Sequence, residues 1–256
     1  MRASLFDTRS IQRYIFSGNR LKTNIGASYL VAHVFEDFLL PVLADTFGNE
    51  NVDLDGWKQG ETGINSAAVC RVAYIGGGNA LILYRDDVTT EQCVAVAEQF
   101  TCSLLVNCPG LSVGAAHGIL HTEDDGEFAK DIATLYRTLK KNQNTVSPTV
   151  NVPYTGLTLL CSVNNETANR YDADGKIKTD ADEGGRFYSQ ETFAKTIAAE
   201  KANNHLRRLF PNVGEDFVFP MSIDSLGQRT TETVGHAPER AHRDGQNRIS
   251  QCSESY

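Results

Sequence analysis

The 256-residue sequence has no apolar run as long as the roughly 20 residues that a membrane-spanning helix needs. Its most apolar stretches, 28–34 and 38–44, lie close to His, Asp, Glu and Pro residues. A secretion signal is also missing, because Asp7 follows a very short apolar start. Basic residues are in the minority, with 24 Lys and Arg against 32 Asp and Glu and a formal net charge of −8. We therefore expect a cytoplasmic protein without a membrane segment, whose overall field does not hold it on nucleic acid.

Several site motifs are absent as well. The six cysteines include no CxxC pair and mostly lie in apolar segments, so we expect small buried side chains and neither a disulfide framework nor a zinc site. No GxxxxGK[ST] is present, which excludes a P-loop, and no GxGxxG joins a strand to a helix. The acidic stretch 172–183 places Gly175 at the wrong position for a calcium-binding EF-hand, so we expect a solvated acidic loop there.

The apolar periodicity of the remaining chain predicts an α+β fold. Strands are expected at 4–6, 67–75, 80–84, 110–117 and 155–161, and helices at 10–17, 27–47, 89–107, 127–142 and 189–209. Within this order lies the succession β-α-β-β-α-β, which is the ferredoxin-like arrangement.

A glycine-rich turn, Gly76-Gly77-Gly78-Asn79, is expected to join two strands as a hairpin. A plain turn is the simpler interpretation, but such a turn also lets a phosphate or a base approach the backbone closely. In a ferredoxin-like sheet Asp7 would lie beside this hairpin. It could cap the next helix or, with a partner carboxylate, hold Mg²⁺.

Three segments together resemble a known family: DTRSIQRYIF at 7–16, LK at 21–22 with IGAS at 25–28, and YIGGGNAL at 74–81. They are similar to the polymerase/cyclase-like palm of the type III CRISPR effector large subunit, a fold shared with GGDEF nucleotide cyclases. The resemblance spans about residues 3–227, with further matches at 108–111, 116–117, 139–140, 154–161 and 219–227.

Those large subunits carry two palms, one catalytic with Gly-Gly-Asp-Asp on its hairpin and one with a degenerate turn that helps to bind nucleotide. Gly78 and Asn79 stand where the two aspartates would be, and neither supplies the carboxylate that two-metal phosphoryl transfer needs. The resemblance therefore implies the non-catalytic palm. It also implies no zinc, because only Cys161 remains where related proteins hold a cysteine zinc site.

The implied site has no catalytic residue. ATP with Mg²⁺ is its expected ligand, and Asp7 is the one candidate metal ligand. A second, catalytic palm is the expected partner. We expect contact with RNA only indirectly and no contact with a membrane. The residues expected to bind nucleotide are Asp7, Thr8, Ser10, Gly76, Gly77, Gly78 and Asn79.

We divide the chain into a palm at 1–162, a degenerate loop with a helical extension at 163–227, and a poorly ordered tail at 228–256. At 242–245 the tail resembles the start of the first strand of a second palm. This resemblance would fit a truncated gene product that lacks its catalytic half. The expected function is nucleotide binding in CRISPR-type antiviral defence, without activity in isolation. Two alternatives stay open: a divergent nucleotide cyclase that uses Asp7 with Asp86 or Asp87, and a structural interaction module without a ligand.

Overall fold

The computed structural model describes residues 1–60, 67–145, 154–173, 175, 177 and 187–210. The tail at 228–256 and the second-palm resemblance at 242–245 lie outside the described residues. The elements in chain order are β1 (Arg2–Arg9), α1 (Ile11–Ile15), α2 (Leu21–Val34), the π-helical η1 (Phe35–Leu39), α3 (Leu40–Phe47), the 3-10 turn η2 (Asn49–Asn51), β2 (Val52–Asp53), the 3-10 turn η3 (Gly56–Gln59), β3 (Cys70–Gly76), β4 (Asn79–Tyr84), α4 (Thr90–Asn107), β5 (Ser112–Ile119), α5 (Asp125–Thr145), β6 (Arg170–Tyr171), β7 (Phe187–Tyr188) and α6 (Gln190–Leu209).

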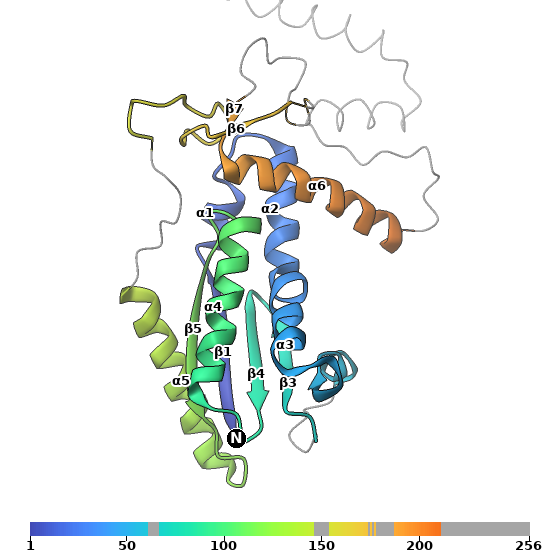
Figure 1. Cartoon of the computed structure of the whole chain (residues 1–256), viewed down its shortest axis with the longest axis vertical. Coiled ribbons are helices and arrows are strands. Elements are labelled where there is room, and N and C mark those ends of the chain that lie inside the picture. Colours follow the sequence, from blue (N-terminus) through green and yellow to red (C-terminus); the bar gives the residue numbers. More distant parts are fainter. Residues whose placement is uncertain (61–66, 146–153, 174, 176, 178–186, 211–256) are drawn as a thin grey trace, which may run out of the picture.

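The main sheet has the order β2-β3-β4-β1-β5 (Figure 1). Apart from the two-residue β2, this is the strand order of a ferredoxin-like β-α-β-β-α-β fold. The central strand β1 is antiparallel to both of its neighbours, β4 and β5. The predicted α+β fold is therefore confirmed.

The predicted hairpin between β3 and β4 is also confirmed. Gly76 pairs with Asn79, and the two residues between them have positive φ, 61° at Gly77 and 85° at Gly78. Positive φ at both central positions gives the turn whose twist matches that of the flanking strands, and glycine adopts it without a steric penalty. The sequence GGGN therefore specifies this turn.

Helices cover both faces of the sheet. The main core lies between the sheet and the helices α2, α3 and α4, and includes Phe6, Ile82, Phe35 and Phe100. On the opposite face α5 packs Leu135 and Leu139 against a smaller cluster of sheet residues. The Asp7 side of β1 belongs to this second face, because Phe6 points into the main core and side chains alternate along a strand.

The first long helix runs without a break from Leu21 to Phe47 through α2, η1 and α3, whereas the sequence indicated a start at residue 27. Its most apolar 18-residue window has a mean hydropathy of 1.4. The whole helix is therefore long and apolar enough to cross a membrane, although each uninterrupted apolar run within it is too short to do so. A core helix meets the same criterion, and Leu30, Val34 and Leu39 of this helix are buried in the main core.

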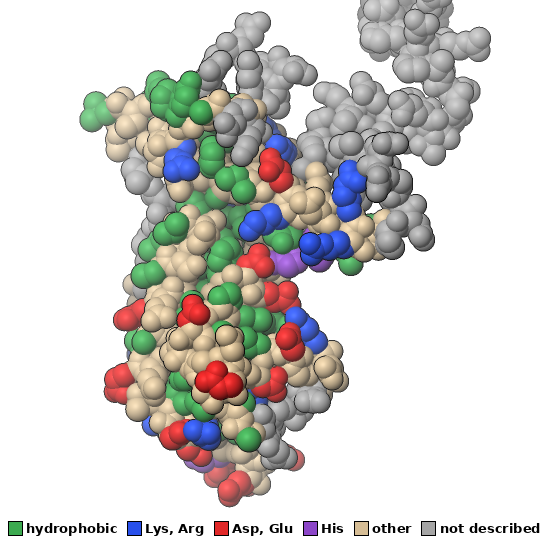
Figure 2. Space-filling model, turned by 45° about the vertical axis from the view of Figure 1, so that its right-hand side comes forward, with side chains coloured by type: hydrophobic (Ala, Val, Ile, Leu, Met, Phe, Trp, Pro, Cys, Tyr) green, Lys and Arg blue, Asp and Glu red, His purple; other side chains and the backbone are tan. Residues whose placement is uncertain are grey.

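Helix α6 crosses α2 at a very close approach. A Cβ on Gly26 of α2 would lie 1.7 Å from the carbonyl oxygen of Lys195, so only glycine permits this packing. Figure 2 shows the Lys and Arg side chains gathered along α6, while Asp and Glu side chains spread over the sheet-and-helix body below it. Helix α6 therefore packs directly on α2.

Three predictions from the sequence are wrong. Residues 155–161 form no strand, and only an isolated bridge joins Leu160 to Thr167, because the segment lies outside the main sheet and leaves Leu157 93% exposed. Asp172 is not solvated but 2% exposed, since its carboxylate accepts a hydrogen bond from the Ile177 amide at 2.9 Å. Cys102 lies exposed on α4, although the other described cysteines are buried as expected.

Candidate nucleotide site at the hairpin

The end of β1 fixes the glycine turn to the sheet. The backbone amide and the side-chain hydroxyl of Thr8 both donate to the carbonyl oxygen of Gly78, each at 2.9 Å. Thr8 is 5% exposed, so these bonds are shielded from water. In the strand register Asp7 lies directly opposite Asn79. The structure therefore brings Asp7, Thr8 and the four turn residues together.

The three glycines of the turn differ in what surrounds them. A Cβ at Gly76 or Gly77 would meet no atom within 4 Å, so the backbone there is open to an incoming group. A Cβ at Gly78 would lie 2.5 Å from the Thr8 hydroxyl and 2.9 Å from Ile11 Cδ1. Gly78 is thus required by packing, whereas Gly76 and Gly77 leave open space beside the backbone.

The carboxylate of Asp7 already has a protein partner. The side-chain amide of Gln143, near the end of α5, donates to Asp7 Oδ2 at 2.8 Å. Gly114 makes this contact possible, because a Cβ there would lie 2.4 Å from Gln143 Cγ. Arg9 donates to the Gln143 carbonyl oxygen and holds the same turn of α5 against β1. A cation at Asp7 would have to share or displace the Gln143 amide.

Two tyrosines stand on the same side of the sheet. The hydroxyls of Tyr74 and Tyr136 lie 2.9 Å apart and join β3 to α5. Burial raises the pKa of Tyr74 well above 10.0, and the hydrogen bond with Tyr136 and the charge of Asp7 add to this shift. The Tyr74 hydroxyl therefore stays protonated at neutral pH and acts as a hydrogen-bonding group.

Ser10 follows β1 and precedes α1. It adopts a left-handed conformation with φ 53°, its carbonyl oxygen accepts from the Tyr14 amide at 2.9 Å, and its side chain makes no cap. It is exposed at the start of a helix of only five residues. Ser10 thus directly follows the strand that holds the hairpin, but within the described residues no hydrogen bond ties its side chain to the turn.

Carboxylates are scarce around the hairpin. Among the described residues no three His, Cys, Asp or Glu side chains lie close enough together to hold a metal ion. Asp86 Oδ1 pairs with the Met1 ammonium at 3.0 Å, and Asp87 pairs with Arg85 at 2.6 Å. Both acids lie at the opposite end of β1, where Arg2 pairs with Tyr84. They do not supply a second carboxylate beside Asp7.

The sequence did not reveal that Gln143 would bond Asp7 or that Tyr136 would pair with Tyr74. Polar residues of an amphipathic helix carry no signal of their own. Only the packing of α5 across the sheet brings Gln143 and Tyr136 to these partners. Gly114 was the one available hint, since a glycine inside a strand often marks a close approach.

Comparison with known proteins gives structural neighbours only. No family model matches the sequence, and no curated protein matches it. The chain is similar in structure to a crystal structure of the Csm1–Csm4 cassette in complex with cA4, with 16% identity, a TM-score of 0.40, and coverage of 56% of this chain and 19% of that chain. The Csm1–Csm4 cassette in complex with pppApA gives 17% identity, a TM-score of 0.40, and coverage of 56% and 19%. The apo cassette gives 17% identity, a TM-score of 0.39, and coverage of 56% and 18%. The chain spans less than a fifth of the length of these neighbours.

Proposed function

We propose that this chain is a nucleotide-binding, cyclase-like palm protein of CRISPR-type antiviral defence that is inactive alone and acts beside a catalytic palm. One observation carries the proposal: the open backbone at Gly76 and Gly77 lies beside Asp7, at the end of the central strand. A backbone without side chains admits a phosphate or a base closely, and a neighbouring carboxylate favours a cation on that phosphate. The family resemblance of the sequence points to the same residues.

The donor set suits one Mg²⁺ ion better than two. Magnesium commonly uses one or two protein carboxylates together with the phosphates of its nucleotide. Asp7 offers one carboxylate, and Asn79 opposite it offers a neutral amide. Bound Mg²⁺ would neutralise part of the triphosphate charge, while this chain's residues would position the nucleotide. Two-metal phosphoryl transfer needs more carboxylates than this, which is why we propose binding without turnover.

The cyclase alternative would need a second acid near Asp7. Asp86 and Asp87 are engaged with Met1 and Arg85 at the far end of the strand. The interaction-module alternative requires only that the hairpin binds nothing.

Calorimetric titration of the full chain with ATP, with and without Mg²⁺, tests the proposal. We expect the wild type to bind, and Gly77→Val to bind at least about tenfold more weakly, because a branched side chain would fill the space that the phosphate needs. Gly60→Val is the matched control. Gly60 also has positive φ, +80°, and open space within 4 Å, but it lies after η3, outside the hairpin.

The outcomes separate the candidates. Equal ATP affinity in folded Gly77→Val and Gly60→Val would place the nucleotide elsewhere. No heat of binding in the wild type would favour the interaction module. Asp7→Asn should weaken only the Mg²⁺-dependent part of the affinity, since it removes charge and keeps the shape of the side chain.

A further inference from the structure

Among the residues that the structure describes, strand β5 forms one edge of the main sheet, with β1 as its one neighbouring strand. Its eight residues, SVGAAHGI, include no charged residue and no proline. Natural proteins usually protect an edge strand with such residues or with a bulge, because the free amides and carbonyls of the strand pair readily with another strand. β5 therefore has neither a charged side chain nor a proline to prevent pairing with another strand.

The outward backbone groups of β5 can be assigned from two hydrogen bonds. The Leu120 amide donates to the Met1 carbonyl oxygen at 2.8 Å, so the even-numbered residues pair with β1 and the odd-numbered ones point outward. Asn142 of α5 donates to the outward carbonyl oxygen of Ala115 at 2.9 Å and covers that position. Within the described part of the chain, no hydrogen bond reaches the outward groups of His117 and Ile119.

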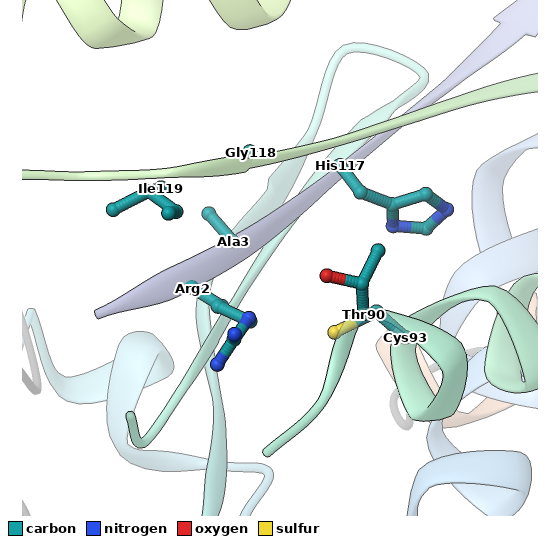
Figure 3. Close-up of a pocket in the computed structure, with 7 residues that line it drawn as sticks. All are labelled: Arg2, Ala3, Thr90, Cys93, His117, Gly118 and Ile119. Carbon is teal, nitrogen blue, oxygen red and sulfur yellow. The ribbon is translucent and has the colours of Figure 1, made fainter. Parts of the chain in front are cut away.

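A small pocket opens beside this half of the edge. Its volume is about 80 Å³, well below the few hundred Å³ of a typical small-molecule site and suited to a single side chain. Figure 3 shows the Thr90 oxygen and the Cys93 sulfur on the side of the pocket that faces Arg2. The lining residues are Arg2, Ala3, Thr90, Cys93, His117, Gly118 and Ile119.

The pocket favours a negative group. Arg2 Nη1 donates to the carbonyl oxygens of Asp86 and Val88 at 2.9 and 2.5 Å, and Arg2 forms no ion pair with any described carboxylate. Its remaining N–H groups are therefore available. The start of α4 is already occupied: the pKa of Glu91 is lowered by hydrogen bonds from its own backbone amide and the Thr89 side chain, with a smaller contribution from the charge of Arg2, and Thr89 caps the Gln92 amide. The remaining N–H groups of Arg2 are therefore the groups that match a carboxylate.

We propose that the β5 edge binds an extended segment of a partner protein as an added strand, with an acidic side chain of that segment in the Arg2 pocket. Backbone pairing along His117 and Ile119 would provide affinity, and the pocket would select the side chain. A second copy of β5 fits less well, because SVGAAHGI has no acidic residue to fill the pocket. The proposal is independent of nucleotide binding at the hairpin, which lies at the other end of β1.

Peptide titration of the isotopically labelled full chain tests the proposal by NMR. The probes are three synthetic peptides of alternating Thr and Val that differ only at the centre, which is Glu, Gln or Lys. We expect the Glu peptide to shift the amides of His117 and Ile119 and to slow their hydrogen exchange. The Gln peptide should bind about tenfold more weakly, because it loses a charge-assisted hydrogen bond. Equal binding of all three peptides, or shifts confined to other strands, would overturn the proposal.

A backbone variant tests the edge itself. Ile119→Pro removes an outward amide and leaves the even-numbered ladder to β1 in place, so it should abolish binding of the Glu peptide. Ile119→Thr keeps the amide but changes one side chain that lines the pocket, so it should retain far more affinity for the Glu peptide than Ile119→Pro does. Unchanged affinity in Ile119→Pro would refute strand addition, and a dimer that Ile119→Pro dissolves would make a second copy the occupant. If Ile119→Pro does not fold, the three peptides on the wild type still decide.

Discussion

The imidazole of His117 shows how burial sets the protonation of a single residue. Its Nδ1 lies 2.7 Å from the hydroxyl of Ser4, which is 0% exposed. Burial lowers the pKa of His117 below 6.5. The folded state therefore favours the neutral ring, and protonation of the ring favours the unfolded state.

The sign of the resulting pH dependence follows. Between the lowered pKa and 6.5 the unfolded chain binds more protons, so the free energy of unfolding decreases as pH falls through this window and is fully retained above it. Urea unfolding from neutral pH to about pH 5 measures this slope. His117→Gln should flatten it. Identical slopes in the wild type and His117→Gln would contradict the assignment.

A second residue-scale prediction concerns the buried ion pair of α6. Lys195 and Glu191 are 2% and 4% exposed and lie 2.5 Å apart, and Lys195 also donates to Ser17 Oγ at 2.8 Å. Lys195→Met removes the cation that faces the buried Glu191 carboxylate and should cost about 3–5 kcal/mol in unfolding free energy. The double variant Lys195→Met/Glu191→Leu should recover most of this loss. Lys201→Met, on the exposed face of the same helix, is the control in the same urea measurements.

At the scale of elements, the contact between α2 and α6 depends on one missing side chain. Gly26→Ala places a Cβ against the backbone of Lys195, where 1.7 Å is available, so the helices must separate. We expect the free energy of unfolding to fall by about 1–3 kcal/mol and the amides of α6 to exchange hydrogen faster. Ser28→Ala, on the exposed side of α2, should leave both unchanged. Full protection of α6 in Gly26→Ala would show that the contact is unimportant.

The sequence predicted those elements whose signal is local. The triple glycine between two β-rich runs specifies its turn, and the helix expected at 89–107 is α4, which begins after the N-cap Thr89. The segment 155–161 looks like a strand locally but has no neighbouring strand to pair with. Long-range packing likewise decides that Gln143 reaches Asp7, that Asp172 is buried, and that Gly26 must be glycine. Such contacts leave no periodic pattern in the sequence.

At the scale of the whole molecule, β1 connects the two regions to which we assign binding. Its last residues carry the hairpin site at Asp7, and its first residues carry the Arg2 pocket beside β5. Helix α5 covers the Asp7 face of the sheet and reaches the β5 edge through Asn142. The same helix therefore limits access to the hairpin carboxylate and to the upper part of the edge strand.

This arrangement predicts that the isolated chain makes neither cyclic nor linear oligonucleotides. Two Mg²⁺ ions on a triphosphate need several carboxylates at roughly 2.0–2.1 Å. Asp7 at the hairpin is bonded to Gln143, and no three His, Cys, Asp or Glu side chains of the described residues lie close enough together to hold a metal ion. Asp86 lies seven residues beyond Asn79, roughly 20 Å away at ~3.3 Å per residue. An aspartate at position 78 could not simply restore the site, because its Cβ would lie 2.5 Å from the Thr8 hydroxyl.

The measurement is incubation of the purified chain with ATP and GTP in Mg²⁺ or Mn²⁺, followed by mass spectrometry of the products. No oligonucleotide should form, and Asn79→Asp should also remain inactive, because a second carboxylate opposite Asp7 still leaves the site without a catalytic partner palm. Asp7→Ala is the control for contaminating activity. Product that forms with the wild type and disappears with Asp7→Ala would make the chain an enzyme in its own right, with a metal site that Gln143 must leave before each turnover.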